Sequence, residues 1–218
     1  ASVGDIDDNS GLTTQMNLAK KHGVQYLVIP GDYAYNSASG VQTKVKTVFP
    51  SDKTIVAVGN HDSCSNVKSW VGVSTCYYVK SIGNTVDFFV IDGNTGFGCT
   101  TAQFDFFKDE IPKSDATYKI VVIHQPFATV KSDHGPNGQF NCFNEIFQNN
   151  NVDVVAQAHN HNYQIVKSGK TWYGVFGMGT HDTGSSMYGC DSTTFNNIPV
   201  KCITGTNGIE VIDLGLTS

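Results

Sequence analysis

The sequence lacks several features that would each assign a protein to a class. It has no apolar run long enough to cross a membrane, no Cys-x-x-Cys pair of the kind found in structural zinc sites, and no Asn-x-Ser/Thr glycosylation site. No internal repeat, low-complexity tract or linker stands out. We therefore expect one domain that spans residues 1–218, without a membrane span.

Positive charge is also scarce. Lysine and arginine total 14 against 19 aspartates and glutamates, which gives a net charge of −5 and a pI of about 5.7. Nucleic acids and anionic membranes require clustered lysine and arginine, so we expect no nucleic-acid partner. The same net charge would repel a phosphate substrate unless bound metal cations reverse the local field. Composition leaves the oligomeric state open.

The chain has six cysteines, at positions 64, 76, 99, 142, 190 and 202. An even count favours three disulfides and a secreted or other oxidising location, whereas six reduced thiols in a cytosolic enzyme are the alternative. The 22 glycines and many small polar residues favour the secreted, loop-rich interpretation. Cys64–Cys76 and Cys190–Cys202 are the local pairs, although spacing alone leaves the connectivity open.

Short apolar runs alternate with amphipathic segments along the chain. The expected strands cover residues 25–29, 54–58, 86–91, 119–123, 153–157, 163–166, 171–176 and 209–214. The expected helices cover residues 10–22, 101–110 and 140–149, with Ser10 as the N-cap of the first. This alternation predicts an α/β fold.

Five short stretches carry side chains that bind metal ions, and four of them directly follow apolar strands. They are Asp5 in VGDID, Asp32 and Tyr35 in GDYAY, Asn60 and His61 in GNHD, His124 in VVIH, and His159 with His161 in AHNH. Polar groups that follow strands of an α/β sheet gather at one edge. Carboxylate, phenol, amide and imidazole together suit iron, manganese or zinc. Each residue alone fits a turn or a core position, but five stretches in order predict a dinuclear metal site.

His159 and His161 form a His-x-His pair, a metal-ligand pattern of its own. Residues two apart on an extended segment point the same way, so we expect both imidazoles to face one centre.

The series Asp … GDxxY … GNHD … VxxH … xHxH resembles the purple acid phosphatases, within the calcineurin-like metallophosphoesterases. The resemblance covers residues 3–166 and is closest to the small, single-domain, mammalian-type members; DHGP at 133–136 and HNHNYQ at 159–164 add to it. Tyr35 discriminates most, because most other metallophosphoesterases place a histidine in the first motif and lack this tyrosine. The resemblance implies a single catalytic domain with a layered αββα sandwich of two mixed sheets flanked by helices.

The resemblance also implies which side chains hold which metal. Asp5, Asp32, Tyr35 and His161 would bind Fe(III). Asp32, Asn60, His124 and His159 would bind a divalent metal (Fe, Zn or Mn), so that Asp32 bridges the two ions.

The implied activity is that of an acid phosphatase on small-molecule phosphoesters. A metal-bound hydroxide would attack a phosphate monoester, while His61 and His134 bind the phosphate or protonate the leaving group. Asp62 would orient a ligand or His61 from behind. One alternative is a phosphodiesterase or nucleotide phosphohydrolase that uses Mn or Zn. The other is a non-catalytic extracellular binding or structural module on the same fold.

The chain departs from the family pattern at Asp7, where glycine is usual. We expect this carboxylate to crowd the site, recruit a further cation or point to solvent. His181, in GTHDTG, is interpreted as a surface-loop residue, with lining of the substrate groove as the alternative. Residues 177–208 are expected to form long loops tied by a disulfide.

Overall fold

The computed structural model describes residues 1–131, 134–182 and 189–214. Its helices are α1 (Ser10–Lys21), α2 (Ala38–Lys46), α3 (Cys64–Val71), α4 (Ala102–Glu110) and α5 (Phe140–Asn149), with the 3-10 turns η1 (Ser51–Lys53) and η2 (Ile111–Lys113). Its strands are β1 (Leu27–Ile29), β2 (Thr54–Val56), β3 (Tyr78–Ile82), β4 (Val86–Val90), β5 (Tyr118–Val122), β6 (Val154–Gln157), β7 (Tyr163–Ser168), β8 (Thr171–Phe176), β9 (Thr194–Phe195), β10 (Ile198–Pro199) and β11 (Lys201–Ile203).

Seven strands form one mixed sheet in the order β11-β7-β8-β6-β5-β4-β3. Its centre is parallel, because β4 pairs with β5, β5 with β6, and β6 with β8 in parallel, whereas β3, β7 and β11 pair antiparallel. β1 and β2 form a separate parallel pair, to which Ser2 adds a parallel bridge with Val28 and an antiparallel bridge with Glu210. β9 and β10 form a small antiparallel pair.

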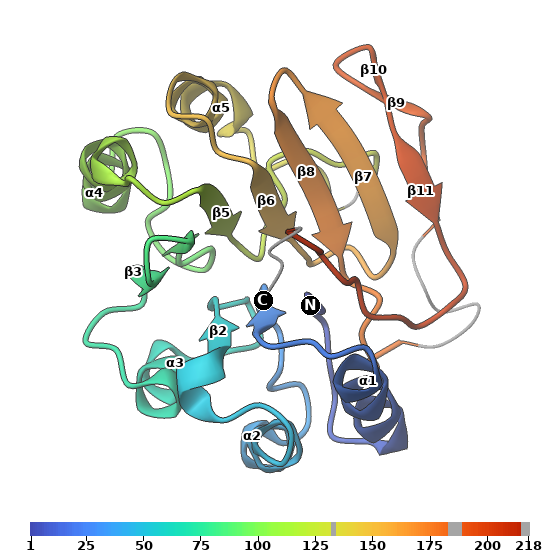
Figure 1. The fold of residues 1–218 in the computed structure, drawn as a ribbon. Helices are drawn as coiled ribbons and strands as arrows, with labels where there is room; N and C mark the ends of the chain where they lie inside the picture. Colours follow the sequence, from blue (N-terminus) through green and yellow to red (C-terminus); the bar gives the residue numbers. More distant parts are fainter. Residues whose placement is uncertain (132–133, 183–188, 215–218) are drawn as a thin grey trace.

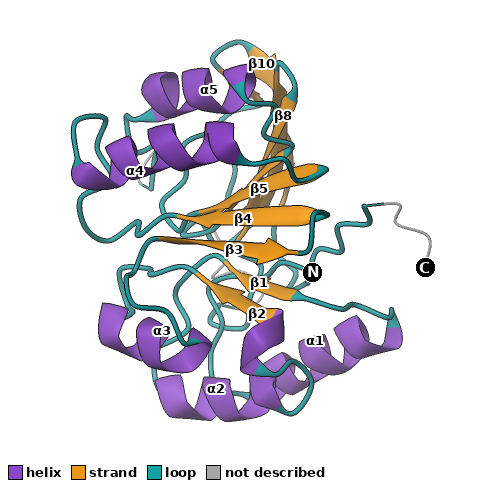
Figure 2. Cartoon of the chain, turned by 60° about the vertical axis from the view of Figure 1, so that its left-hand side comes forward, coloured by secondary structure: helices purple, strands orange, loops and turns teal. Residues whose placement is uncertain are grey.

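The seven-stranded sheet and the β1–β2 sheet are stacked between helices (Figures 1 and 2). In Figure 2, α4 and α5 cover one face of the large sheet, the β1–β2 pair lies toward its other face, and α1, α2 and α3 cover the outside of that pair. The expected α/β fold, with a mixed sheet flanked by helices, is therefore confirmed. The second sheet is the smaller of the two.

Buried apolar side chains fill each interface between the layers. Phe107 of α4 and Phe143 of α5 pack on the large sheet in one cluster. Val28 of β1 belongs to the cluster between the sheets, whereas Leu27 and Ile29 belong to the cluster beneath α1, α2 and α3. Successive side chains of a strand point to opposite faces, so a strand covered on both sides is apolar throughout.

Two details of the expected elements are wrong. Asn9, not Ser10, caps α1, because its side chain accepts hydrogen bonds from the amides of Gly11 and Leu12. Residues 209–214 form no strand beyond a single bridge, in which Glu210 exchanges backbone hydrogen bonds of 2.8 and 3.0 Å with Ser2. The expected strand at residues 209–214 is therefore reduced to this one bridge.

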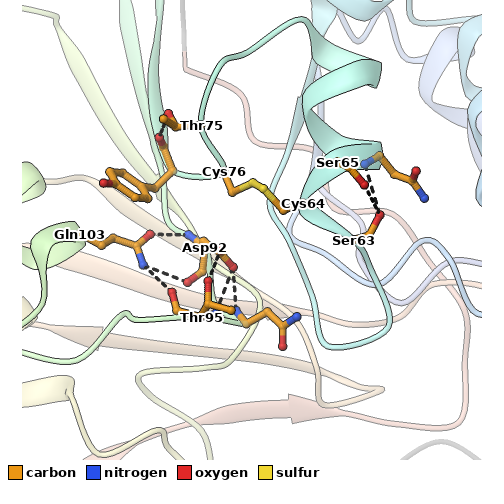
Figure 3. Close-up of a disulfide and its surroundings, with 11 residues drawn as sticks. Ser63, Cys64, Ser65, Thr75, Cys76, Asp92, Thr95 and Gln103 are labelled. Atoms are coloured by element: carbon orange, nitrogen blue, oxygen red, sulfur yellow. Dashed lines mark hydrogen bonds between the residues drawn. A yellow bond between two sulfur atoms is a disulfide. The ribbon is translucent and has the colours of Figure 1, made fainter.

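All six cysteines form disulfides: Cys64–Cys76, Cys99–Cys142 and Cys190–Cys202. Both expected local pairs are confirmed, and Figure 3 shows the first of them, which ties the start of α3 to the segment before β3. Three disulfides favour an oxidising compartment. Among the residues described, no helix is both long and apolar enough to cross a membrane.

Candidate metal centre

The predicted ligands lie at the carboxyl ends of parallel strands. Asp32 follows β1, Asn60 follows β2, His124 follows β5 and His159 follows β6. Because β1 pairs with β2 and β5 with β6 in parallel, the two residues of each pair leave their sheet in the same direction. The 3.1 Å contact between His124 Nε2 and Asp32 Oδ2 joins the two pairs. The predicted convergence of side chains from distant parts of the sequence is thus a consequence of the topology.

Three of the predicted ligands have an unusual backbone conformation. Asp5, Asp32 and His159 have φ angles of 56°, 52° and 70°, in the left-handed region that few residues other than glycine adopt. Such conformations cost about 1–3 kcal/mol each and persist where the surrounding structure holds them, often at functional sites. Here the amide of His159 donates a 3.0 Å hydrogen bond to Asp5 Oδ2 and ties two of the strained positions together.

One group of donor atoms surrounds the Tyr35 hydroxyl. This oxygen lies 3.0 Å from Asp5 Oδ1, 2.9 Å from Asp32 Oδ2 and 3.1 Å from His161 Nε2. His161 Nε2 also lies 3.3 Å from Asp5 Oδ1. The four side chains that the resemblance assigns to Fe(III) therefore meet at one point, which we call the tyrosine set.

A second group of donor atoms surrounds His124. Its Nε2 lies 3.1 Å from Asp32 Oδ2 and 3.0 Å from Asn60 Oδ1. Its Nδ1 donates a 3.0 Å hydrogen bond to the carbonyl of Pro30, which aims Nε2 into the site. Donor atoms of Asp32, His124 and His159 all lie within 4.8 Å of one another. We call Asp32, Asn60, His124 and His159 the histidine set.

The spacing of these atoms fits metal coordination. Two ligands at right angles, each about 2.1 Å from one ion, lie about 3 Å apart. The contacts within the tyrosine set span 2.9 to 3.3 Å. Asp32 Oδ2 contacts the key atom of both sets, Tyr35 Oη and His124 Nε2. The donor atoms of each set are therefore close enough to hold a cation, and Asp32 belongs to both sets.

Asp62 and Gly59 fix the position of Asp32. Asp62 is buried, and its carboxylate accepts hydrogen bonds from the amides of Asp32 (2.7 Å), Gly59 (2.9 Å) and Tyr33 (2.9 Å), which joins the loops after β1 and β2. A Cβ at Gly59 would lie 2.1 Å from Asp32 Oδ1, so only glycine fits beside this carboxylate. The expected orienting role of Asp62 thus has a structural basis.

The pKa values reflect closely packed charges. Burial and the Asp32 carboxylate raise the pKa of Asp62 to about 6. Burial, and then the charge of His124, lower the pKa of His159 to about 4. Burial and the carboxylates of Asp5 and Asp32 raise the pKa of Tyr35 far above its usual value. Cations between these groups would relieve the repulsion among the acids, which agrees with the fit of the donor set.

The model of the calcineurin-like phosphoesterase family matches residues 3–163. The chain belongs to this family. The family consists of phosphoesterases that bind divalent metals, in agreement with the donor atoms described above. No curated protein shows a significant match to the sequence.

Several solved structures share this phosphoesterase fold. Purple acid phosphatase PPD1 from yellow lupin (Lupinus luteus) seeds superposes with a TM-score of 0.64 and 12% identity, over 81% of this chain and 43% of the lupin chain. GAP50 of Plasmodium gives 0.63 and 14%, over 95% and 78% of the two chains. A dimetal phosphatase from Danio rerio gives 0.59 and 10%, over 80% and 85%. At these identities the likeness concerns the fold alone.

The two histidines predicted to act on the substrate of this phosphoesterase lie beside the ligand sets. His61 is exposed, its ring centroid is 4.4 Å from that of Tyr35, and its amide donates a 2.9 Å hydrogen bond to Asp32 Oδ1. The ring centroid of His134 is 4.6 Å from that of His159. Asp133, in the DHGP phrase, lies outside the described residues.

The expectation that the His-x-His pair lies on an extended segment is wrong. His159 has a φ of 70°, and the amides of Asn160 and Asn162 donate hydrogen bonds to carbonyls only two residues earlier. The segment is a tight turn, so its two imidazoles separate: His161 joins the tyrosine set and His159 the histidine set.

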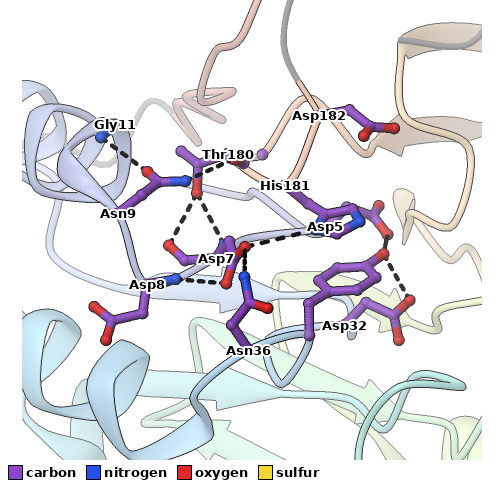
Figure 4. A network of polar contacts seen from close by, with 12 residues as sticks. Asp5, Asp7, Asp8, Asn9, Gly11, Asp32, Asn36, Thr180, His181 and Asp182 are labelled. Carbon is purple, nitrogen blue, oxygen red and sulfur yellow. Dashed lines mark hydrogen bonds and ion pairs between the residues drawn. The ribbon is translucent and has the colours of Figure 1, made fainter. Parts of the chain in front are cut away.

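The departure at Asp7 has a structural explanation (Figure 4). Asp7 is buried, and its carboxylate accepts hydrogen bonds from Asn36 Nδ2 (2.5 Å) and the amide of Asp8 (2.8 Å), with His181 Nδ1 3.7 Å away. These contacts direct the Asp7 carboxylate toward Asn36, Asp8 and His181 rather than toward the tyrosine set. It therefore neither crowds the ligands nor points to solvent.

His181 lies in a loop and is half-buried, and its ring contacts favour the alternative interpretation, a place beside the site. Its ring stacks on that of Tyr35, with centroids 3.5 Å apart and planes 6° from parallel. The next residue, Asp182, was not singled out from the sequence, yet its Oδ2 lies 2.5 Å from His161 Nδ1. Both residues follow β8, which pairs in parallel with β6, so the rule that located His159 also applies to them. Of the expected loop region 177–208, residues 183–188 lie outside the described ranges. The expectation of loops alone is wrong for the rest, because it contains β9, β10 and β11, whereas the expected disulfide, Cys190–Cys202, is present.

Proposed function

We propose that this phosphoesterase hydrolyses small phosphate monoesters at a dinuclear metal centre, as an acid phosphatase of the purple acid phosphatase type. One observation carries the proposal: Asp32 Oδ2 contacts both the tyrosine set and the histidine set. Two donor sets that share one carboxylate would suit a pair of neighbouring cations.

The chemistry of each set supports a metal assignment. The tyrosine set offers two carboxylates and a phenol oxygen, hard donors that suit Fe(III). The histidine set offers imidazole nitrogens and an amide oxygen beside the shared carboxylate, which suit divalent Fe, Zn or Mn. Two cations there would neutralise phosphate oxygens and lower the pKa of an attacking water.

The residues around the ligands supply the remaining functions. His61 is exposed beside Tyr35, and His134 lies against His159, so both are available to a phosphate bound over the ligand sets. We assign to them binding of the phosphate and protonation of the leaving group. Positioned proton donors of this kind contribute about 10²–10⁴ in rate.

The same proposal includes the type of purple acid phosphatase and the secretion of the protein. Tyr35, in its GDYAY motif, favours a purple acid phosphatase, and the resemblance of residues 3–166 favours the small, single-domain, mammalian-like type. Three disulfides favour secretion, because such bonds persist in oxidising compartments.

Two alternatives remain on the same fold. A phosphodiesterase or nucleotide phosphohydrolase with Mn or Zn would use the same ligands on a different ester. A non-catalytic extracellular binding module is favoured by the likeness to GAP50, which is described as "the anchor in the inner membrane complex of Plasmodium" and aligns with 95% of this chain.

Steady-state assays with a phosphate monoester and a matched phosphate diester separate these functions. We expect the wild type to prefer the monoester, to lose activity after chelation and to regain it with added metal, while Asp32→Ala stays inactive. Preference for the diester would favour the second function. Metal-replete protein that hydrolyses neither ester would contradict the proposal and favour the binding module.

A further inference from the structure

Residues 179–182, which follow β8, are held against the loop that carries Asp5. The amide of His181 donates a 3.1 Å hydrogen bond to the Asp5 carbonyl. Thr180 Oγ1 accepts a hydrogen bond from the amide of Asp7 (2.9 Å) and donates one to its carbonyl (3.1 Å). Asn207 Nδ2 donates a 2.7 Å hydrogen bond to the Asp182 carbonyl. This backbone is therefore fixed relative to the ligand sets.

Asp182 contacts one predicted ligand, His161. Its Oδ2 lies 2.5 Å from His161 Nδ1, while His161 Nε2 faces the Tyr35 hydroxyl at 3.1 Å and Asp5 Oδ1 at 3.3 Å. A carboxylate that accepts the proton of one ring nitrogen leaves the other nitrogen to the metal and fixes the plane of the ring.

His181 contacts a second predicted ligand, Tyr35. Its ring lies flat on Tyr35 at 3.5 Å between centroids, and the ring of His61 also contacts Tyr35, at 4.4 Å. His181 Nδ1 lies 3.7 Å from Asp7 Oδ2, and that oxygen also accepts the hydrogen bond of Asn36, the residue after Tyr35 (Figure 4). Rotation of the phenol away from the tyrosine set would break these contacts.

We propose that His181 and Asp182 form a positioning pair for the tyrosine set: Asp182 aims His161, and His181, steadied by Asp7, holds the ring of Tyr35. The inference rests on the proposed function, because it assigns these residues to the ion of that set. The inference also gives a role to Asp7, at the position where the family usually has glycine. Its carboxylate contacts His181, and this chain carries both residues.

Metal affinity of matched variants tests the role of Asp182. Fe(III) and Zn(II) are titrated against a competing chelator into wild type, Asp182→Ala, Asp182→Asn and, as a control on the exposed face of α5, Glu145→Ala. We expect Asp182→Ala to weaken one of the two ions about 10–100-fold. Asp182→Asn should recover most of the loss, since its amide oxygen still accepts the Nδ1 proton, and Glu145→Ala should match wild type. Wild-type affinity in Asp182→Ala, or equal losses in Asp182→Ala and Asp182→Asn, would overturn the role.

A measurement on metal-free protein separates this inference from the proposed function. The short contact between His161 and Asp182 predicts a hydrogen-bonded imidazole proton far downfield in the NMR spectrum, present in the wild type and lost in Asp182→Ala. Absence of that proton in the wild type would overturn the positioning role while leaving the proposed function intact. Wild-type protein that binds no metal would overturn both.

Variants of position 181 test the second half of the pair. In protein loaded with Fe(III), His181→Ala should shift and weaken the visible absorption of the tyrosine–iron pair, because the phenol loses its stacking partner. His181→Phe preserves a flat ring and should retain the band. A band that is unchanged in His181→Ala would overturn the role of this residue.

Discussion

Asp62 offers the sharpest test of how the protein holds its candidate metal centre. Its carboxylate accepts three backbone hydrogen bonds, from Asp32 at 2.7 Å and from Gly59 and Tyr33 at 2.9 Å each. Three hydrogen bonds to a charged group contribute about 4.5–9 kcal/mol together. The raised pKa of Asp62, about 6, means that burial and Asp32 disfavour its ionised form by about 3 kcal/mol. The difference predicts that Asp62→Ala lowers the free energy of unfolding by about 2–6 kcal/mol. This is a large share of the about 5–15 kcal/mol that stabilises an ordinary domain.

Urea unfolding with the disulfides intact measures this loss. The comparison belongs at pH 8, where the carboxylate is ionised, because burial and Asp32 raise its pKa to about 6. Asp62→Asn is the matched control: its amide oxygen replaces Oδ2, which accepts two of the bonds, but its NH₂ group opposes the amide of Tyr33. We expect about 1–3 kcal/mol from the lost partner. Buried donors that lose their partners are costly, so a decrease in unfolding free energy below about 1 kcal/mol in Asp62→Ala would refute the reasoning.

Three further predictions concern Gly59, the proposed proton donor His134 and the Cys64–Cys76 disulfide. Gly59→Ala should lower metal content and activity, because the new Cβ would lie 2.1 Å from Asp32 Oδ1. Gly189→Ala is the control and should match wild type, because a Cβ at that position meets no atom within 4 Å. Equal metal content in the two variants would contradict this prediction. His134→Ala should retain both metals and slow turnover about 10²–10⁴-fold, as steady-state kinetics with metal analysis would show; unchanged turnover would exclude a catalytic role. Joint replacement of Cys64 and Cys76 by serine removes a disulfide that closes a loop of sequence separation 12. The unfolding free energy measured in urea should decrease by about 3 kcal/mol. An unchanged urea midpoint would argue against this disulfide.

Much of the fold was predictable because its central strands are buried on both faces. Such strands are continuous apolar runs, and their alternation with helices predicted β4, β5, β6 and the β7–β8 hairpin close to their observed bounds. The amphipathic pattern likewise placed α5 at residues 140–149. The helices α2 and α3 were missed because they are short and rich in residues of low helix propensity, such as Ser39, Gly40 and Asn66. The formation of such helices depends on tertiary packing.

The candidate site was predictable where single residues follow strands, and less so where the backbone turns. Asp32 and His124 could be placed at a sheet edge from the sequence alone. The left-handed φ of His159 could not, and the expectation of an extended His-x-His pair therefore failed. His181 and Asp182 were missed or misread because no motif marks them; their positions follow from the parallel pairing of β6 and β8, which only the structure reveals.

The central claim is that Asp32 lies between two metal ions. Diffraction data collected at metal absorption edges, from crystals of protein purified without chelator, test it most directly. We predict two anomalous peaks, one beside Tyr35 and His161 at the iron edge and one beside His124 and His159, with Asp32 Oδ2 between them. A single peak, or none within reach of Asp32, would contradict the account.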